Sequence, residues 1–423
     1  MREAFLHFIW KYQYFDKENL RTTEGTPINI VHPGYLNTDA GADFSDAKII
    51  IDGIEWRGSI EIHVNATDWF QHGHQKDKNY NNVVLHVVWD SNGIATREDG
   101  TIIPAISLQG IIPERIIFEY KKLMNSPEHV PCENQIQKVK DLVVWSTLDK
   151  VVMERLILKS GKVLERLKIN NQDWEETAYQ LLAANFGFKI NSEPFLILAE
   201  SLPYKIIKKH INNRETVESL LFGQAGFLNE EFEDEYYKHL QGEYGFFKHK
   251  YGLNGRLDAV QWRKLRLRPA NFPMVRLSQF AAMLCHVDSL FQNLLAVESA
   301  RELYSFFKSE VSSYWTTRYH FGEASAKKAP SLGKTSVENI AINTVVPILV
   351  AYGKYIDDER YIARALALLQ DLNAENNKII KYWRSIGMPM SSSFDTQAYI
   401  QLYNNYCQKR RCLECNIGVS LIR

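Results

Sequence analysis

The amino-acid sequence predicts an α+β protein, with an N-terminal α/β domain over about residues 1–115 and a large all-α region over residues 116–423. Before residue 115, runs rich in β-branched residues alternate with two helical stretches. Almost every later segment carries apolar residues at helical spacing instead. A hydrophobic content of 45% with 24% charged residues is ordinary for a globular chain and excludes wholesale disorder.

The elements of the first domain follow from local patterns. A helix is expected over residues 2–15, where aromatic and aliphatic side chains recur at helical spacing. Later candidates are strands at 26–32, 48–52, 57–64, 83–89 and 101–108, and a short helix at 68–74. Gly53 separates two of these strands and predicts a hairpin. The almost continuous β-branched run at 83–89 predicts a strand buried on both faces. The expected order is helix, strand, hairpin, helix, buried strand, strand.

Helices separated by proline and glycine are predicted for the rest of the chain. They are expected at 113–125, 141–168, 173–186, 192–201, 203–210, 214–223, 228–249, 276–293, 298–310, 336–353, 357–371, 374–385 and 394–406. No fixed repeat period is found, which argues against a helical solenoid.

The charge balance limits the classes of partner. Fifty Lys+Arg balance fifty Asp+Glu, so a global attraction to nucleic acid or anionic membranes is excluded, although a local basic groove is not. No apolar run approaches the roughly 18–20 residues of a membrane span, and the N-terminus lacks the pattern of a signal peptide. Five cysteines, an odd number, argue against a disulfide framework. We expect a cytoplasmic protein without a membrane partner.

Candidate functional residues are densest between residues 41 and 86. Four of the twelve histidines, His63, His72, His74 and His86, fall in this stretch. Glu61 and His63 share one face of a strand, and His86 lies in an apolar run, where a polar group needs a partner. These residues can be satisfied structural polars, or His63, His72 and His74 can supply three imidazoles to zinc or iron.

The order of elements and the spacing of acids also resemble the PD-(D/E)xK nuclease core, with its αβββαβ order found in restriction endonucleases. The resemblance matches Asp43 to the first acid, Glu61 to the second and His63 to the basic position. It implies a Mg²⁺- or Mn²⁺-dependent hydrolase that cleaves a phosphodiester of nucleic acid with a metal-activated water. Ala42 replaces the usual proline of the motif and His63 the usual lysine, which puts the role of a base at that position in doubt.

Most of the chain is also similar to an uncharacterised bacterial family known only as a domain of unknown function. The similarity lies in the segments 39–44, 58–63, 68–69, 72–74, 80–83, 86–88 and 268–273 and in the cysteine-bearing tail. This resemblance implies no established activity.

The C-terminal tail contains Cys407, Cys412 and Cys415. Three thiols at this spacing in a reducing compartment indicate zinc or an iron–sulfur cluster, with Cys132 or a histidine as a fourth ligand. Some nuclease domains of the type named above carry such a cluster, built from one distant and three grouped cysteines. The alternative is a set of reduced thiols packed near the chain end.

A basic run offers a candidate nucleic-acid contact. Its residues are Arg263, Lys264, Arg266 and Arg268, with Trp262 and Phe272 interleaved. Such runs are more often solvated surface. Two functions therefore remain open: a metal-dependent nuclease-like enzyme, or a non-catalytic scaffold that keeps a degenerate or histidine-metal site and binds a protein partner through its helices.

Overall fold

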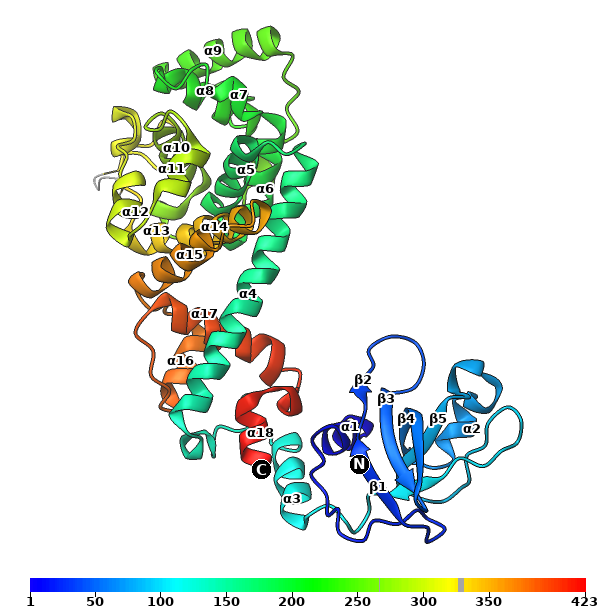
Figure 1. Ribbon diagram of the computed structural model, residues 1–423. Coiled ribbons are helices and arrows are strands. Elements are labelled where there is room, and N and C mark those ends of the chain that lie inside the picture. The colour runs from blue at the N-terminus through cyan, green and yellow to red at the C-terminus, as the bar shows by residue number, and fades with distance from the viewer. Residues whose placement is uncertain (266, 326–330) are drawn as a thin grey trace. The chain divides into compact units, whose positions relative to one another are not determined.

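The computed structural model describes residues 1–265, 267–325 and 331–423 and confirms the α+β class (Figure 1). The chain forms two compact units. The first comprises Met1–Thr147 and the C-terminal segment Tyr403–Arg423, and the second comprises Leu148–Leu402. Helix α4 (Asp141–Ile169) contains the division between them, whereas the sequence composition changes earlier, near residue 115.

The first unit has the predicted order of elements. It contains α1 (Glu3–Tyr12), β1 (Ile28–His32), β2 (Tyr35–Leu36), β3 (Phe44–Ile51), β4 (Ile54–Asn65), α2 (Asp68–Gln71), β5 (Val83–Asp90), β6 (Ala105–Ser107), α3 (Glu114–Met124) and α18 (Asn416–Ile422). The turn between β3 and β4 is Asp52-Gly53, with φ of 49° and 79°. Positive φ at both positions suits the right-handed twist of a hairpin, and Asp-Gly adopts it readily.

The strands form one mixed sheet in the order β1-β3-β4-β5-β6, with β2 paired to β3. Strands β1, β3 and β4 are antiparallel, whereas β5 runs parallel to β4 and β6 parallel to β5. Figure 1 shows β3, β4 and β5 side by side. The first six residues of β5 are buried, as its apolar run predicts.

Strand β6 is shorter than the predicted strand at 101–108 because its first residues pair elsewhere. Ile102 bridges Thr96, and Ile103 N donates to Ala95 O. Residues 101–103 therefore close a small hairpin loop, and only Ala105–Ser107 extends the sheet.

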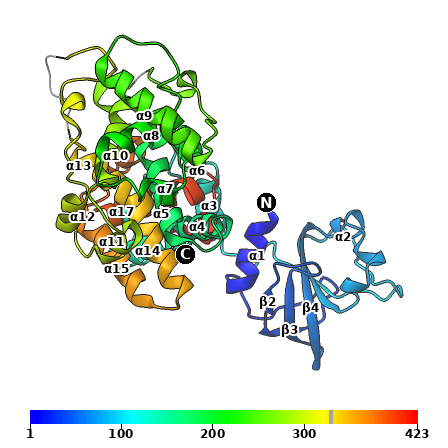
Figure 2. The same cartoon turned by 90° about the horizontal axis from the view of Figure 1, so that it is seen from above.

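The second unit is helical within the residues that the structure describes. After α4 come α5 (Trp174–Phe186), α6 (Phe188–Ser201), α7 (Tyr204–Ile207), α8 (Arg214–Gln224), α9 (Glu235–Tyr251), α10 (Pro273–Leu284), α11 (Leu290–Ala296), α12 (Ala300–Phe306), α13 (Lys334–Ile340), α14 (Val346–Tyr355), α15 (Glu359–Asp371), α16 (Lys378–Ser385) and α17 (Ser393–Leu402). Helices α8 and α9 pack side by side in both views (Figures 1 and 2).

Two predicted helices differ from the observed ones for local reasons. Helix α9 starts at Glu235 rather than near 228, because the Asp234 carboxylate accepts from Tyr237 N and caps the helix there. The segment 276–293 forms two helices, α10 and α11, separated at Cys285–Ser289.

The sequence predicts no apolar run of membrane-spanning length, but one helical stretch of the described chain, Lys334–Tyr355, has the length and hydropathy to cross a membrane. Its most apolar window is 72% buried inside the protein, as is typical of a core helix in a globular domain. This stretch includes a π-helical turn between α13 and α14.

Candidate functional site

Asp43 and Glu61 lie on adjacent antiparallel strands. Phe44 pairs with Ile60 across β3 and β4, which places Asp43, just before β3, beside Glu61. The N–H of Asp43 donates to Glu61 Oε2 at 3.0 Å, and the N–H of Ile62 donates to Asp43 Oδ2 at 2.9 Å. The two carboxyl groups that the sequence predicts to meet are therefore brought together and oriented by backbone hydrogen bonds.

Glu61 is a buried acid in contact with the histidines. Its Oε1 lies 3.2 Å from His74 Nε2 and 3.6 Å from His63 Nε2. Burial, and then the negative charge of Asp43, raise the pKa of Glu61 to about 8. The carboxyl group is therefore mainly protonated at neutral pH unless a cation joins the site.

His63 stands at the centre of an imidazole cluster. Its Nδ1 lies 2.8 Å from His86 Nε2, and its Nε2 lies 3.1 Å from His72 Nδ1. Burial, followed by the neighbouring His74 and His72, lowers the pKa of His63 to about 4, and burial lowers the pKa of His86 to about 3. Both rings are neutral at pH 7, which is the form of histidine that binds metals.

Three of these histidines form a potential metal-binding group. The ligand atoms of His63, His72 and His74 all lie within 4.8 Å of one another. His63 is buried, His74 is half-buried and His72 is exposed, so the group reaches from the protein interior to solvent. His86 is buried beneath them and contacts His63, which makes it a partner of a ligand rather than a member of the group.

A second group, which the sequence reasoning missed, comes from helix α1. Glu3, His7 and Asp43 also bring their ligand atoms within 4.8 Å of one another. His7 Nε2 lies 3.2 Å from Asp43 Oδ2. Glu3 and His7 are four residues apart and therefore share one face of α1. The sequence shows this spacing, but it does not show which residues that face contacts.

Three imidazole nitrogens in this region are buried without a hydrogen-bond partner among the described residues: His7 Nε2, His74 Nε2 and His86 Nδ1. The Nε2 atoms of His7 and His74 each lie 3.2 Å from a carboxylate oxygen. A buried polar atom without a partner is costly, and a cation between such nitrogens and oxygens would satisfy both.

Aromatic packing holds the histidines in place. Trp69 is fully buried at the start of α2, and its Nε1 donates to Thr96 O at 2.9 Å. The ring of Tyr80 stacks on His74 at 3.8 Å between centroids, and Trp69 meets the same imidazole edge-on at 5.3 Å. These contacts fix the loop after β4 against the sheet.

The tail cysteines belong to the first unit together with Cys132. Cys407, Cys412 and Cys415 are buried free thiols, and Cys132 is buried as well. The fifth cysteine, Cys285, lies in the second unit at the end of α10 and is only partly buried.

The basic run lies in the second unit. Arg263, Lys264 and Arg268 are exposed, and Arg266 lies outside the described residues. Arg263, Lys264 and Arg268 occupy a loop between short 3₁₀ turns rather than a helix face. Trp262 is buried and donates through Nε1 to Ala225 O, so it is not free to stack on a base.

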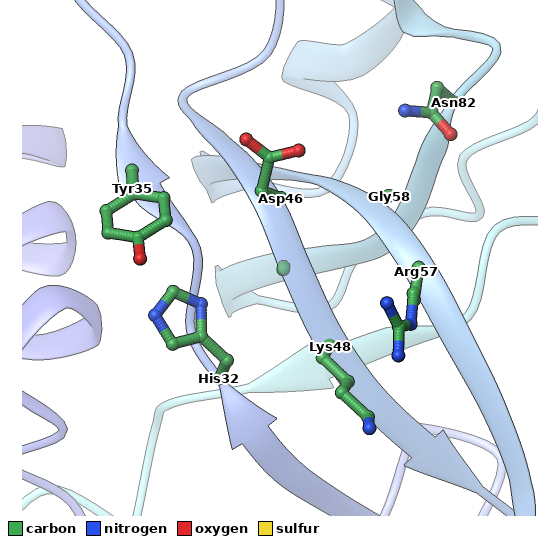
Figure 3. A pocket seen from close by; sticks show the side chains of 8 residues that line it. His32, Tyr35, Asp46, Lys48, Arg57, Gly58 and Asn82 are labelled. Atoms are coloured by element: carbon green, nitrogen blue, oxygen red, sulfur yellow. The ribbon is translucent and has the colours of Figure 1, made fainter.

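Figure 3 shows a pocket of about 460 Å³ in the first unit, beside β1 to β4. It is lined by His32, Tyr35, Asp46, Ala47, Lys48, Arg57, Gly58 and Asn82. Glu55 neutralises its two basic side chains, with Oε2 2.7 Å from Lys48 Nζ and Oε1 3.0 Å from Arg57 Nε. Within the described chain, none of the predicted site residues lines this pocket.

These features define a two-unit α+β protein whose first unit carries a carboxylate–histidine cluster suited to metal binding. Residues 3–378 match the family DUF2851, described as a protein of unknown function, and the chain belongs to this family. The expected membership in a domain-of-unknown-function family is confirmed. No curated protein and no solved structure matches the chain.

Proposed function

We propose that the first unit is a metal-dependent, nuclease-like phosphodiesterase that acts on nucleic acid. The observation that carries this proposal is the position of Glu61 between the two ligand groups. One carboxylate oxygen accepts from the backbone of Asp43, a member of the acidic group, and the other lies beside His74, a member of the imidazole group. Adjacent metal positions that share a carboxylate are typical of hydrolases that cleave phosphoesters.

The strand arrangement supports the same proposal. Asp43 precedes one strand of a hairpin, Glu61 lies on the other, and the next strand, β5, runs parallel to β4 after a short helix. This is the arrangement that the resemblance to the PD-(D/E)xK core implies for its two acids.

His63 differs from the lysine usual in that core. Because burial keeps its ring neutral, His63 does not supply the positive charge of a lysine ammonium. Under this proposal His63 is a ligand, together with His72 and His74, and His86 orients its ring from below.

The donor atoms indicate which ions each group suits. Glu3, His7 and Asp43 combine carboxylates with one imidazole, which favours Mn²⁺ over Mg²⁺, and three imidazoles favour zinc or iron. A bound divalent cation supplies an activated water and neutralises charge on the phosphodiester. The protein orients the metal ligands and keeps Glu61 away from water, where an ionised carboxylate would interact most strongly with a bound cation.

The exposed Arg263, Lys264 and Arg268 are proposed contacts to the phosphate backbone. Replacing all three with alanine should weaken nucleic-acid binding and reduce its dependence on salt. An unchanged salt dependence would remove this loop from the proposal.

The test is cleavage of labelled single-stranded DNA, duplex DNA and RNA by the full-length chain with Mn²⁺ or Mg²⁺. We expect Mn²⁺-dependent cleavage by the wild type, and a loss of about 100-fold or more in Glu61→Gln. Glu55→Gln is the matched control, because Glu55 is an exposed acid on the same strand outside both ligand groups. Cleavage that survives in Glu61→Gln, or no cleavage of any substrate with either ion, would contradict the proposal.

A scaffold with a histidine-metal site is the second candidate. Burial keeps His63 neutral, as a structural metal ligand requires. Ile157 and Leu158 are exposed on α4, where an apolar surface suits a protein partner. Metal binding without cleavage would favour this candidate.

A further inference from the structure

The described chain gathers four buried thiols from two segments that are far apart in the sequence. Cys132 follows α3, and the other three lie in the final turns of the chain. Cys132 interacts electrostatically with Cys412 and Cys415, and Cys407 interacts with all three of the others. All four belong to the same compact unit.

The backbone presents the three tail cysteines from one tight loop. Cys407 ends a π-helical turn, Cys412 starts a 3₁₀ turn, and Cys415 is the N-cap of α18. Gly418 lets α18 fold back over this loop, because a Cβ at that position would lie 2.3 Å from Cys412 O. Helix α18 also packs against α3, the element that precedes Cys132.

A cation lies beside the thiols. The charge of Arg410 acts on Cys407 and Cys412. Its Nη1 atom is buried and has no hydrogen-bond partner among the residues that the structure describes. A guanidinium in this position would be satisfied by an anionic centre, and a metal with four thiolate ligands carries net negative charge.

We infer that Cys132, Cys407, Cys412 and Cys415 bind a thiophilic metal centre, either a zinc ion or an iron–sulfur cluster. The centre joins the C-terminal segment to the loop after α3. Four thiolates can bind either a zinc ion or an iron–sulfur cluster, and binding releases the thiol protons to solvent. It is separate from the carboxylate–histidine cluster and does not depend on the activity proposed above.

The spacing of the sulfurs bears on the choice of metal. Thiolates on one zinc ion lie within roughly 4 Å of one another, since Zn–S bonds are about 2.3 Å long. Among the described residues, the groups with ligand atoms all within 4.8 Å of one another include no cysteine. Binding of a single zinc ion would therefore draw the sulfurs of these cysteines closer together.

The experiment is elemental and sulfide analysis of the full-length chain purified without oxygen. Iron with acid-labile sulfide and visible absorption identifies a cluster, and about one zinc per chain without visible absorption identifies a zinc site. The bound metal should be lost in Cys132→Ser and in Cys412→Ser. It should be retained in Cys285→Ser, because Cys285 lies in the second unit. Neither metal above background, or full retention in both variants, would overturn the inference.

A measurement on the wild type covers the case in which a serine variant fails to fold. Alkylation of native protein, read by mass spectrometry, should label the four thiols at least ten-fold faster after a chelator removes the metal, and Cys285 at an unchanged rate. Labelling that does not respond to the chelator would show that burial alone protects them, and would equally overturn the inference.

Discussion

The backbone of Asp43 donates a hydrogen bond to the Glu61 carboxylate, while Ile62, the residue after Glu61, donates back to Asp43. These two hydrogen bonds hold the side chains of Asp43 and Glu61 close together, although two ionised carboxylates at this distance would repel each other. The protein avoids that repulsion at neutral pH by keeping Glu61 protonated, since burial and Asp43 raise its pKa to about 8. A divalent cation bound between them would instead favour the ionised form of both carboxylates.

Glu61→Gln should weaken Mn²⁺ binding to the full-length chain about ten-fold or more while leaving the fold intact. Glutamine keeps the acceptor oxygen for Asp43 N and resembles the protonated carboxyl group, but it cannot become a charged ligand. Titration calorimetry measures the affinity, and circular dichroism reports the fold. A folded variant that binds Mn²⁺ with the affinity of the wild type would remove Glu61 from the metal site.

His7→Gln should also weaken Mn²⁺ binding, because His7 contributes an imidazole nitrogen 3.2 Å from Asp43 Oδ2. His32→Gln is the matched control, as His32 lies in the same unit outside both ligand groups. Parallel calorimetric titrations of the two variants provide the comparison. Equal affinities in His7→Gln, His32→Gln and the wild type would remove α1 from the metal site.

Gly58→Ala should destabilise the first unit by about 1–3 kcal/mol through overpacking. Its added Cβ would lie 2.4 Å from Asn82 O and 2.5 Å from Val84 Cγ1, so β4 and β5 would have to separate. Gly161→Ala, in an open position on α4, should instead stabilise its helix by about 0.5–1 kcal/mol. Urea unfolding of both variants measures the changes, and a Gly58→Ala protein as stable as the wild type would contradict the packing of these strands.

Stability should fall as the pH rises past the ordinary pKa of Glu218. This side chain is buried in α8, and burial raises its pKa from 4.5 to about 7, against the opposing hydrogen bonds from Tyr236 and Ser312 and the nearby charge of Arg214. Between pH 4.5 and 7 the unfolded state loses this proton while the folded state keeps it, so unfolding becomes easier by up to roughly 3 kcal/mol.

Glu218→Gln removes the titration and should flatten this part of the pH profile. Thermal unfolding midpoints of the wild type and the variant, measured from pH 4 to pH 8, make the comparison. Parallel profiles would show that Glu218 is not protonated in the folded protein.

The order of elements in the first unit could be predicted because each element has a local cause. Asp52-Gly53 specifies the hairpin turn, and the apolar run of β5 specifies a buried strand. The meeting of Asp43 with Glu61 followed from that hairpin, since antiparallel strands place their opposite ends together.

Contacts between distant segments could not be predicted in the same way. Glu3 and His7 are visible as a pair on α1, but only the packing of that helix brings them to Asp43. The neutral state of His63 likewise depends on burial by several segments, which no spacing along the strand reveals.

The central claim is that Asp43, Glu61 and the histidines around them hold divalent cations. The most direct measurement is a crystal structure of the full-length chain soaked in Mn²⁺, with anomalous diffraction used to locate the ion. We predict an anomalous peak within bonding distance of the Asp43 carboxylate and His7 Nε2, with Glu61 as a further or adjacent ligand. A fully soaked crystal with no peak at these residues, and with Glu61 Oε2 still accepting from Asp43 N, would contradict this prediction.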